Sequence, residues 1–311
     1  MSSGRLTLVV GMGLVWLGFL AAGCNHKSSA AGNFPPSEFD KVLAKKSKKW
    51  TNSLGMIFSV TKSNVWFGIW ETRVRDYQVF AEANKRFDNT TEMWVLRNTG
   101  WACLPGFNWR NPGFQQTEDH PVVGVSWDDA KAFCEWLTLK ERQEGLIHSN
   151  QTYRLPKDNE WSLANGFGMY PWGDQWPPGK TAGNFAGWEA RDQDWPETNQ
   201  VMEGWVDAFP RTAPVGSFQA NWYGLYDLAG NVNEWCEDWY NKDLNWTSLR
   251  NKYPHLNNDF GGFQMRVVRG GSWCSIARES LYTLCRDAGT PDLRYSHTGF
   301  RCVLEVSEIN D

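Results

Sequence analysis

Apolar and polar residues follow a regular period only in the first half of this chain. Two short apolar runs, 57–60 and 65–69, enclose a polar turn, a pattern typical of paired strands. Across 72–84, apolar residues recur at the spacing of one helix face. The pattern therefore predicts two strands followed by a helix.

The clearest helix prediction covers 128–141. Ser126 is suited to cap its N-terminus, and the acidic residues that follow suit the positive end of the helix dipole. The apolar stripe of this segment consists of Ala130, Phe133, Cys134 and Leu137. Cys134 should therefore lie on or near the buried face of the helix. A further helix is predicted to begin around Asp158, after Pro156.

Beyond this helix, regular periods disappear. The chain carries 20 Trp and 29 Gly, a combination that indicates tight turns, irregular loops and indole rings used as large packing units. Long ordered loops rarely hold themselves together without ions, disulfides or dense side-chain hydrogen bonding. We therefore expect a loop-rich domain that depends on such additional contacts.

The start of the chain has the organisation of an export signal. Arg5 is the only charged side chain before an apolar run at 6–20, which small residues and then Cys24 follow. An apolar run of this length is shorter than the roughly 20 residues that a transmembrane helix needs. We therefore predict a signal peptide at 1–23 and a polar linker at 24–49.

The segment Ala21-Ala22-Gly23-Cys24 resembles a bacterial lipobox, although Ala21 stands where that motif usually has Leu. The resemblance implies that Cys24 is acylated and anchors the protein to a membrane, each buried CH2 group contributing about 0.8 kcal/mol. Asn25, in place of Asp, favours the outer membrane by the same resemblance. The alternative is an ordinary signal peptide followed by an incidental cysteine.

Charge and cysteine content narrow the classes of function. The formal net charge is −4, and the basic run at 45–49 lies in the predicted linker, so nucleic acid is not an expected partner. Without Cys24, six cysteines remain in a chain that is predicted to enter an oxidising compartment, which favours disulfides. Their spacing matches no zinc motif.

Several segments, in their order along the chain, resemble the formylglycine-generating enzyme family, also called the sulfatase-modifying factor family. These segments are 120–130, Tyr153-Arg154-Leu155-Pro156 with Glu160-Trp161, Tyr170-Pro171-Trp172-Gly173, 212–218, 223–232, Gly270-Gly271-Ser272-Trp273 and Gly299-Phe300-Arg301-Cys302. The resemblance covers residues 50–306 and leaves 307–311 as a tail. It implies an α+β fold, like that of C-type lectins, with little regular secondary structure.

The resemblance also implies two calcium sites built from side-chain and backbone oxygens, which are the ligands that calcium prefers. The residues of the first site are Asp227, Gly230, Val232 and Glu234. The residues of the second site are Asn184, Phe185, Asp207 and Phe209. On the residues alone, the simpler interpretation is that Asp227 and Asp207 cap turns.

Enzymes of the family oxidise a cysteine of a sulfatase to formylglycine, using copper(I) bound by two cysteines. In the family pattern these cysteines lie two and seven positions after the Gly-Gly-Ser-Trp block, where this chain has Ser275 and Ser280. A hydroxyl is a poor copper(I) ligand and forms no thiolate. The copper-binding pair is therefore absent, and the remaining catalytic candidates are Ser272, which matches an active-site serine, and Cys274. Copper is expected only if the protein is an enzyme.

For the cysteines, the resemblance implies a disulfide between Cys134 and Cys302. The other four cysteines leave three pairings open. The pairing that we favour is Cys236 with Cys285 and Cys103 with Cys274.

Two functions are compatible with these features. The first is a non-catalytic binding or scaffold lipoprotein with a protein or carbohydrate partner, in which exposed Trp side chains stack on sugars or pack on a protein, although core packing explains most Trp. The alternative is an active formylglycine-generating oxidase that acts on a cysteine of an exported sulfatase-like protein. A free thiol of low pKa at Cys274 favours catalysis, whereas a disulfide there favours a structural role.

Overall fold

The computed structural model describes residues 49–61, 64–87, 92–166, 168–192, 194–240 and 264–307. All of them belong to one compact unit. The predicted signal peptide, Cys24 and the predicted linker as far as residue 48 lie outside the described residues, as does most of the predicted tail. Within the part of the chain that is described, the helices lack the combination of length and apolarity that crossing a membrane requires.

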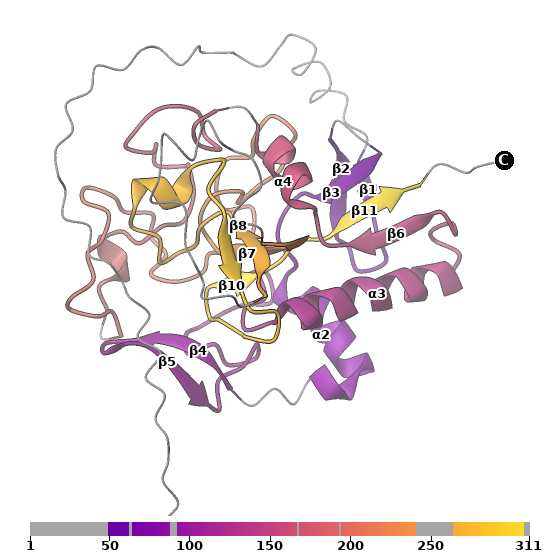
Figure 1. Ribbon diagram of the computed structural model, residues 1–311, viewed down its shortest axis with the longest axis horizontal. Helices are drawn as coiled ribbons and strands as arrows, with labels where there is room; N and C mark the ends of the chain where they lie inside the picture. Colours follow the sequence, from indigo (N-terminus) through magenta and orange to yellow (C-terminus); the bar gives the residue numbers. More distant parts are fainter. Residues whose placement is uncertain are drawn as a thin grey trace, which may run out of the picture. The chain divides into compact units, whose positions relative to one another are not determined.

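A five-stranded sheet has the strand order β1-β2-β3-β11-β6 (Figure 1). Its strands are β1 (Lys49–Thr51), β2 (Ile57–Val60), β3 (Val65–Gly68), β6 (Gln151–Arg154) and β11 (Val303–Val306). The predictions of strands at β2 and β3 are confirmed. Although β11 comes last along the chain, it lies inside the sheet, where Leu304 pairs with Trp66 of β3 on one side and Tyr153 of β6 on the other.

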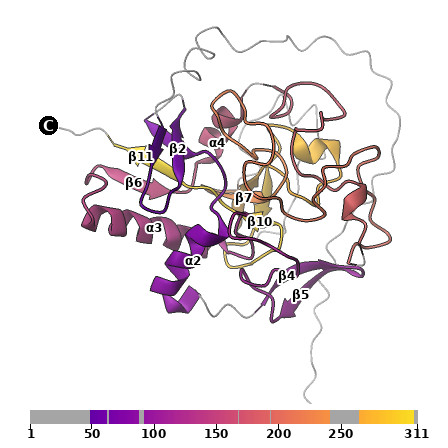
Figure 2. The ribbon, with the colours of Figure 1, turned by 180° about the vertical axis from the view of Figure 1, so that it is seen from behind.

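Helix α3 (Trp127–Gln143) lies alongside β6 (Figures 1 and 2). Helix α2 (Val74–Ala83) packs against α3 on the side away from β6. As predicted, Ser126 caps α3, its hydroxyl accepting a 3.1 Å hydrogen bond from the Asp129 N–H. The apolar stripe of α3, Cys134 included, is fully buried with β2, β6 and β11 in one core. The predicted helix at 72–84 is confirmed as α2, whose Tyr77 ring stacks on Phe133 of α3 at 6.1 Å between centroids.

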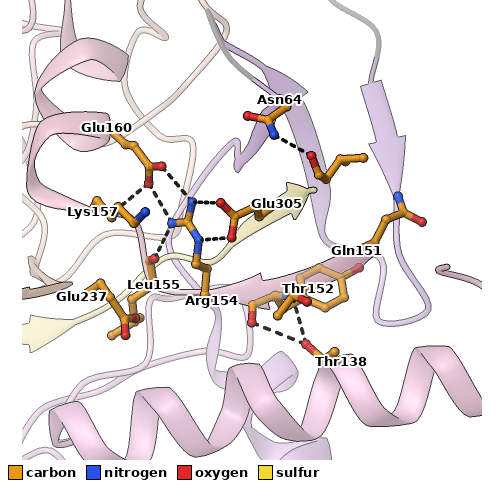
Figure 3. A network of polar contacts seen from close by, with 12 residues as sticks. Asn64, Thr138, Gln151, Thr152, Arg154, Leu155, Lys157, Glu160, Glu237 and Glu305 are labelled. Atoms are coloured by element: carbon orange, nitrogen blue, oxygen red, sulfur yellow. Dashed lines mark hydrogen bonds and ion pairs between the residues drawn. The ribbon is translucent and has the colours of Figure 1, made fainter. Parts of the chain in front are cut away.

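The predicted helix after Pro156 is α4 (Asp158–Asn165). Arg154, at the end of β6, connects this helix to the sheet (Figure 3). Its guanidinium donates to Glu160 of α4 at 2.7 and 2.8 Å and to Glu305 of β11 at 2.9 and 3.2 Å. One side chain with two forked partners thus fixes α4 against the five-stranded sheet.

The remaining strands form two smaller sheets. A four-stranded sheet has the order β10-β7-β8-β9, and β4 pairs with β5 as a hairpin with a two-residue turn. Their bounds are β4 (Glu92–Arg97), β5 (Gly100–Pro105), β7 (Asn233–Trp239), β8 (Arg266–Arg269), β9 (Asp287–Gly289) and β10 (Thr298–Gly299). Three 3-10 helices complete the described elements: η1 (Lys85–Phe87), η2 (Trp188–Ala190) and η4 (Arg278–Leu281).

The long connection between α4 and β7 is held by aromatic rings. Tyr170 stacks on Trp172 with ring centroids 4.7 Å apart, and Phe185 contacts Trp205 at 5.5 Å. Among the described residues, four Trp side chains have no more than 1% of their surface exposed: Trp109, Trp161, Trp235 and Trp273. These indoles serve as packing units, as the composition predicted. The fold is α+β and loop-rich, and this expectation is confirmed.

Candidate functional site

The Gly-Gly-Ser-Trp block forms a tight turn directly after β8. Gly271 has a φ of +72°, a left-handed conformation that favours glycine. The Ser275 N–H donates to the carbonyl of Ser272 at 2.9 Å, and the Ser272 N–H donates to the Ser275 hydroxyl oxygen at 3.0 Å. Ser275, which stands where the family has its first copper-binding cysteine, therefore closes this turn through its hydroxyl group.

The second of these positions, Ser280, lies in η4, where its hydroxyl donates to the carbonyl of Ala277 at 2.6 Å. A Cβ atom placed on Gly271 would lie 3.1 Å from the Ser275 hydroxyl oxygen and 3.4 Å from the Ser280 carbonyl oxygen. The fold thus brings together the two segments that the resemblance pairs. It places hydroxyls there, and both are used in local turns, so these residues do not fit a copper(I) site.

The two catalytic candidates lie in contact. The Cys274 sulfur is 3.2 Å from the hydroxyl oxygen of Ser272, a side chain that is itself buried. Burial raises the pKa of the Cys274 thiol to about 11, although the Ser272 hydroxyl and the charge of Arg211 act in the opposite direction. The thiol is therefore protonated at neutral pH, which disfavours a nucleophile or a metal ligand.

The residues of the first predicted calcium site precede and enter β7. Asp227 and Gly230 have φ values of +56° and +77°, so the chain turns sharply here. Glu234 is fully buried, and its carboxylate accepts hydrogen bonds from Arg301 at 2.5 and 2.7 Å and from the Trp161 indole at 2.9 Å. One of the two carboxylates of this predicted site is therefore already paired with a cation.

A third carboxylate, Glu71, lies in the same cluster. Sequence reasoning missed it because it is more than 150 residues away from Asp227. Burial and the charge of Asp227 raise its pKa well above the usual value, and burial raises the pKa of Asp227 to about 6. Glu71 Oε2 and Asp227 Oδ1 are buried and accept no hydrogen bond from any other described residue, but the two carboxyl groups lie close enough to share a proton with each other. When ionised, three carboxylates and the single guanidinium of Arg301 leave two negative charges beneath the surface.

The second predicted site is centred on Asp207. Its carboxylate accepts hydrogen bonds from the N–H groups of Phe185 and Phe209 at 2.8 and 2.9 Å, so it does cap a turn. Burial nevertheless raises its pKa to about 6. Asn184 is fully buried, and its Oδ1 accepts no hydrogen bond in the part of the chain that is described. Buried oxygens of this kind fit a hard cation.

Asn231 connects the two predicted sites. Its side-chain amide donates to Glu71 at 3.1 Å, and its Oδ1 accepts from the Asn184 amide at 3.3 Å and from the Ala213 N–H at 2.8 Å. The structure thus brings the two sets together around one buried amide. In the described ranges, no metal position is surrounded by three or more His, Cys, Asp or Glu side chains. A cation at either predicted site would therefore need amide or carbonyl oxygens as further ligands.

The six cysteines of the domain are free thiols in the structure. The sulfur atoms of Cys134 on α3 and Cys302, just before β11, lie 3.5 Å apart in the core. Cys236 is buried on β7, Cys103 is exposed on β5, and the remaining two are half-buried. The two sulfurs are thus in contact, and the disulfide between Cys134 and Cys302 stays a prediction. The pairings of the other four cysteines also stay predictions.

Comparisons with known proteins agree with the geometry. Residues 37–306 match the family model described as "Sulfatase-modifying factor enzyme 1-like domain". The chain is 35% identical over 220 residues to a formylglycine-generating enzyme of Thermomonospora curvata, covering 66% of this chain and 64% of that protein. It is 32% identical over 216 residues to the inactive C-alpha-formylglycine-generating enzyme 2 of Mus musculus, covering 65% and 56%. The chain thus spans less than two thirds of the length of these relatives.

Among solved structures, the fold is similar to Treponema denticola variable protein 1, with a TM-score of 0.52. That alignment covers 83% of this chain and 98% of the other, at 19% identity, and so bears on the fold alone. Because the family model matches most of the sequence, this chain belongs to the formylglycine-generating enzyme, or sulfatase-modifying factor, family.

Proposed function

We propose that this protein is an exported, lipid-anchored member of the family. Its domain binds a partner and does not catalyse the oxidation of a cysteine. The observation that carries the proposal is the pair Ser275 and Ser280 at the copper positions, with both hydroxyls hydrogen bonded inside local turns. The neighbouring thiol of Cys274 has a raised pKa and does not replace the missing pair. The name of the mouse relative supports the proposal, since it describes an inactive member of the same family.

The partner is a protein or a carbohydrate. Three Trp side chains in the described surface, Trp188, Trp222 and Trp239, are about half exposed. Large exposed indoles stack on sugar rings or pack on protein surfaces, and they supply much contact area at low entropic cost. Acylated Cys24, outside the described residues, would hold the domain at a membrane.

We also propose that calcium stabilises the domain at both predicted sites. At the first site, the argument rests on the carboxyl groups of Glu71 and Asp227, which are buried, have raised pKa values and share one cation, Arg301, with Glu234. Burying such charges without compensation is costly, so the cluster must take up protons or a divalent cation. Asp227 and Glu71 would hold the ion, together with the carbonyls of Gly230 and Val232, and Glu234 would contribute to the local charge.

The test of catalysis uses the purified chain, copper(I), oxygen and a peptide that contains Cys-x-Pro-x-Arg. We expect no loss of mass from the peptide cysteine, because no thiolate pair is available for copper(I). The matched variant Ser275→Cys/Ser280→Cys should gain copper(I) binding, since the two segments meet at Gly271. Formylglycine produced by the unaltered chain would overturn the proposal in favour of the oxidase, and Cys274→Ser should then abolish the activity.

The test of the anchor is incorporation of a labelled fatty acid by the expressed full chain. The lipoprotein proposal is supported if the unaltered chain takes up the label and associates with membranes, and if Cys24→Ala does neither. Membrane association that survives Cys24→Ala contradicts it.

A further inference from the structure

Strand β5 forms the open edge of the hairpin that it makes with β4. The other side of β4 is occupied by the segment around Tyr295, which is bridged to Trp94. Strand β5 therefore lies at the rim of the described domain, where β4 is the only strand that pairs with it (Figures 1 and 2). A strand in this position presents backbone groups that can pair with another strand.

The hydrogen bonds of Trp94 show which backbone groups of β5 are free. Its N–H donates to the carbonyl of Arg294 at 2.9 Å, and its carbonyl accepts from the Ser296 N–H at 2.9 Å, so both groups point away from β5. Trp94 lies opposite Cys103. Because bonded and non-bonded pairs alternate in an antiparallel ladder, Cys103 and Trp101 both direct their backbone groups away from β4. In the described part of the chain, these groups have no hydrogen-bond partner.

This edge lacks the features that usually prevent pairing. Natural proteins protect free edges with charged side chains, with proline, or with a helix or loop that covers the strand. Strand β5 contains no charged residue, and its single proline, Pro105, is its last residue. Cys103, near the middle of the strand, is exposed. The edge is therefore suited to pair with a further strand.

The sequence of β5 is complementary to itself in an antiparallel arrangement. If Ala102 of one copy lies opposite Ala102 of a second copy, Trp101 lies opposite Cys103. Gly100 then lies opposite Leu104. Each large side chain meets a small one, and Ala102 takes the central non-bonded pair, where side chains come closest. The N–H and carbonyl of Trp101 pair with the carbonyl and N–H of Cys103 at both ends of this centre, so every free group of the two residues is satisfied.

The neighbouring register satisfies fewer groups. If Cys103 of one copy lies opposite Cys103 of the other, Trp101 lies opposite Pro105. Proline has no N–H to donate, so the carbonyl of Trp101 would have no partner in either copy. The hydrogen bonds therefore favour the register that is centred on Ala102.

We propose that this protein forms a two-fold symmetric dimer by antiparallel pairing of β5 with β5 of a second copy, centred on Ala102. The two hairpins then form one four-stranded sheet of order β4-β5-β5-β4. A second copy is favoured over a peptide of another protein because both the side chains and the hydrogen bonds of β5 complement themselves. A single strand pair is a small contact, so the association should be reversible and depend on concentration. The inference goes beyond the proposed function and does not depend on it.

The experiment is sedimentation equilibrium of the purified full chain over a range of concentrations, with a reducing agent that prevents disulfides between copies. Ala102→Lys and Ala102→Glu each place like charges opposite each other at the centre of the pair, which opposes association. An equal mixture of the two variants places opposite charges there instead. The control is Leu139→Lys, which adds the same charge at an exposed position of α3. Thermal unfolding shows whether each variant is folded.

A second variant, Cys103→Pro, tests the hydrogen bonds between the copies. The N–H of Cys103 points away from β4, so proline at this position removes no hydrogen bond of the hairpin. It does remove one hydrogen bond at each end of the proposed pair. We expect this variant to associate about tenfold more weakly than the unaltered chain.

We expect the unaltered chain and Leu139→Lys to form dimers equally. Ala102→Lys and Ala102→Glu should each associate about fivefold more weakly or less, and their mixture should regain the association. A mixture that stays monomeric contradicts pairing at Ala102. If the Ala102 variants do not fold, Cys103→Pro decides, and unchanged association of that variant refutes the inference.

Two further results would overturn the dimer. An unaltered chain that is monomeric at every concentration leaves the edge open for an extended segment of another protein. Association that is unchanged in both Ala102 variants and in Cys103→Pro shows that the copies meet through another surface.

Discussion

Glu234 of β7 and Arg301, which precedes β11, form an ion pair in which neither side chain is accessible to solvent. Arg301 also donates to the carbonyls of Gly68 at 3.2 Å and Tyr226 at 2.9 Å, so its guanidinium connects four segments of the chain. The pair is thus part of the structural frame beneath the first predicted calcium site.

Removing the arginine alone should strongly destabilise the domain. Arg301→Met leaves Glu234 buried without a cation, which typically costs about 3–5 kcal/mol in the free energy of unfolding. Urea denaturation measures the loss. The control is Lys140→Met at the partly exposed surface pair of Lys140 and Glu144, where a loss below about 1 kcal/mol is expected. Similar losses for the two variants would contradict the assigned role of Arg301.

The raised pKa of Asp227 predicts how stability depends on pH in the absence of calcium. The folded protein holds this proton up to a pH of about 6, whereas the unfolded chain releases it near the usual value of 3.8. The folded state therefore binds more protons between these values, and stability falls as pH rises through this window. Urea midpoints measured with chelator should show the fall, and Asp227→Asn should reduce it. If the protein saturated with calcium loses as much stability over this pH range as the protein in chelator, calcium does not bind at Asp227.

Gly230 should tolerate no side chain. A methyl group there would overlap the backbone carbonyl of Asn184, and the residue has a φ of +77°. Gly230→Ala should cost about 2–5 kcal/mol, since overpacking adds to left-handed strain. Gly145→Ala is the matched control, because Gly145 has a similar φ of +71° but open space around it, and should cost about 1–2 kcal/mol. Equal losses of unfolding free energy would show that steric overlap at Gly230 is unimportant.

Cys134 and Cys302 should form a disulfide when the protein is made in an oxidising compartment. Their sulfurs already lie 3.5 Å apart, and the bridge would close a long loop. Alkylation and peptide mass spectrometry should recover the two residues as a linked pair. Cys134→Ser should then cost about 2–5 kcal/mol under oxidising conditions and less after reduction of both proteins. Recovery of Cys302 as an alkylated thiol from the oxidised protein would refute the pairing.

The elements that could be predicted from the sequence are those whose signal is local. Helix α3 carries its cap, its acidic first turn and its apolar stripe within one short segment, and the structure agrees with each of them. The hairpin of β4 and β5 was not predicted. Its turn at Asn98 and Thr99 has no glycine, and no residue of β5 is buried, so the strand lacks alternating burial.

The candidate site was predictable in part for the same reason. The serines at 275 and 280 are found by counting from a motif, and the structure places both segments together at Gly271. Glu71 carries no such signal, because it joins its cluster through the tertiary fold. Arg301 was noted as part of a motif, but its partner on β7 cannot be read from spacing.

The position of β11 in the five-stranded sheet has a consequence for synthesis. Residues 303–306 pair with β3 on one side and with β6 on the other. While these residues remain within the ribosome, β6 lacks this neighbour and Leu304 is missing from the core. The sheet therefore closes only after translation has passed residue 306, and pairing across such a distance is slow. Until then the nascent chain exposes apolar strands, and we expect its yield in cells to depend on chaperones that hold it unfolded.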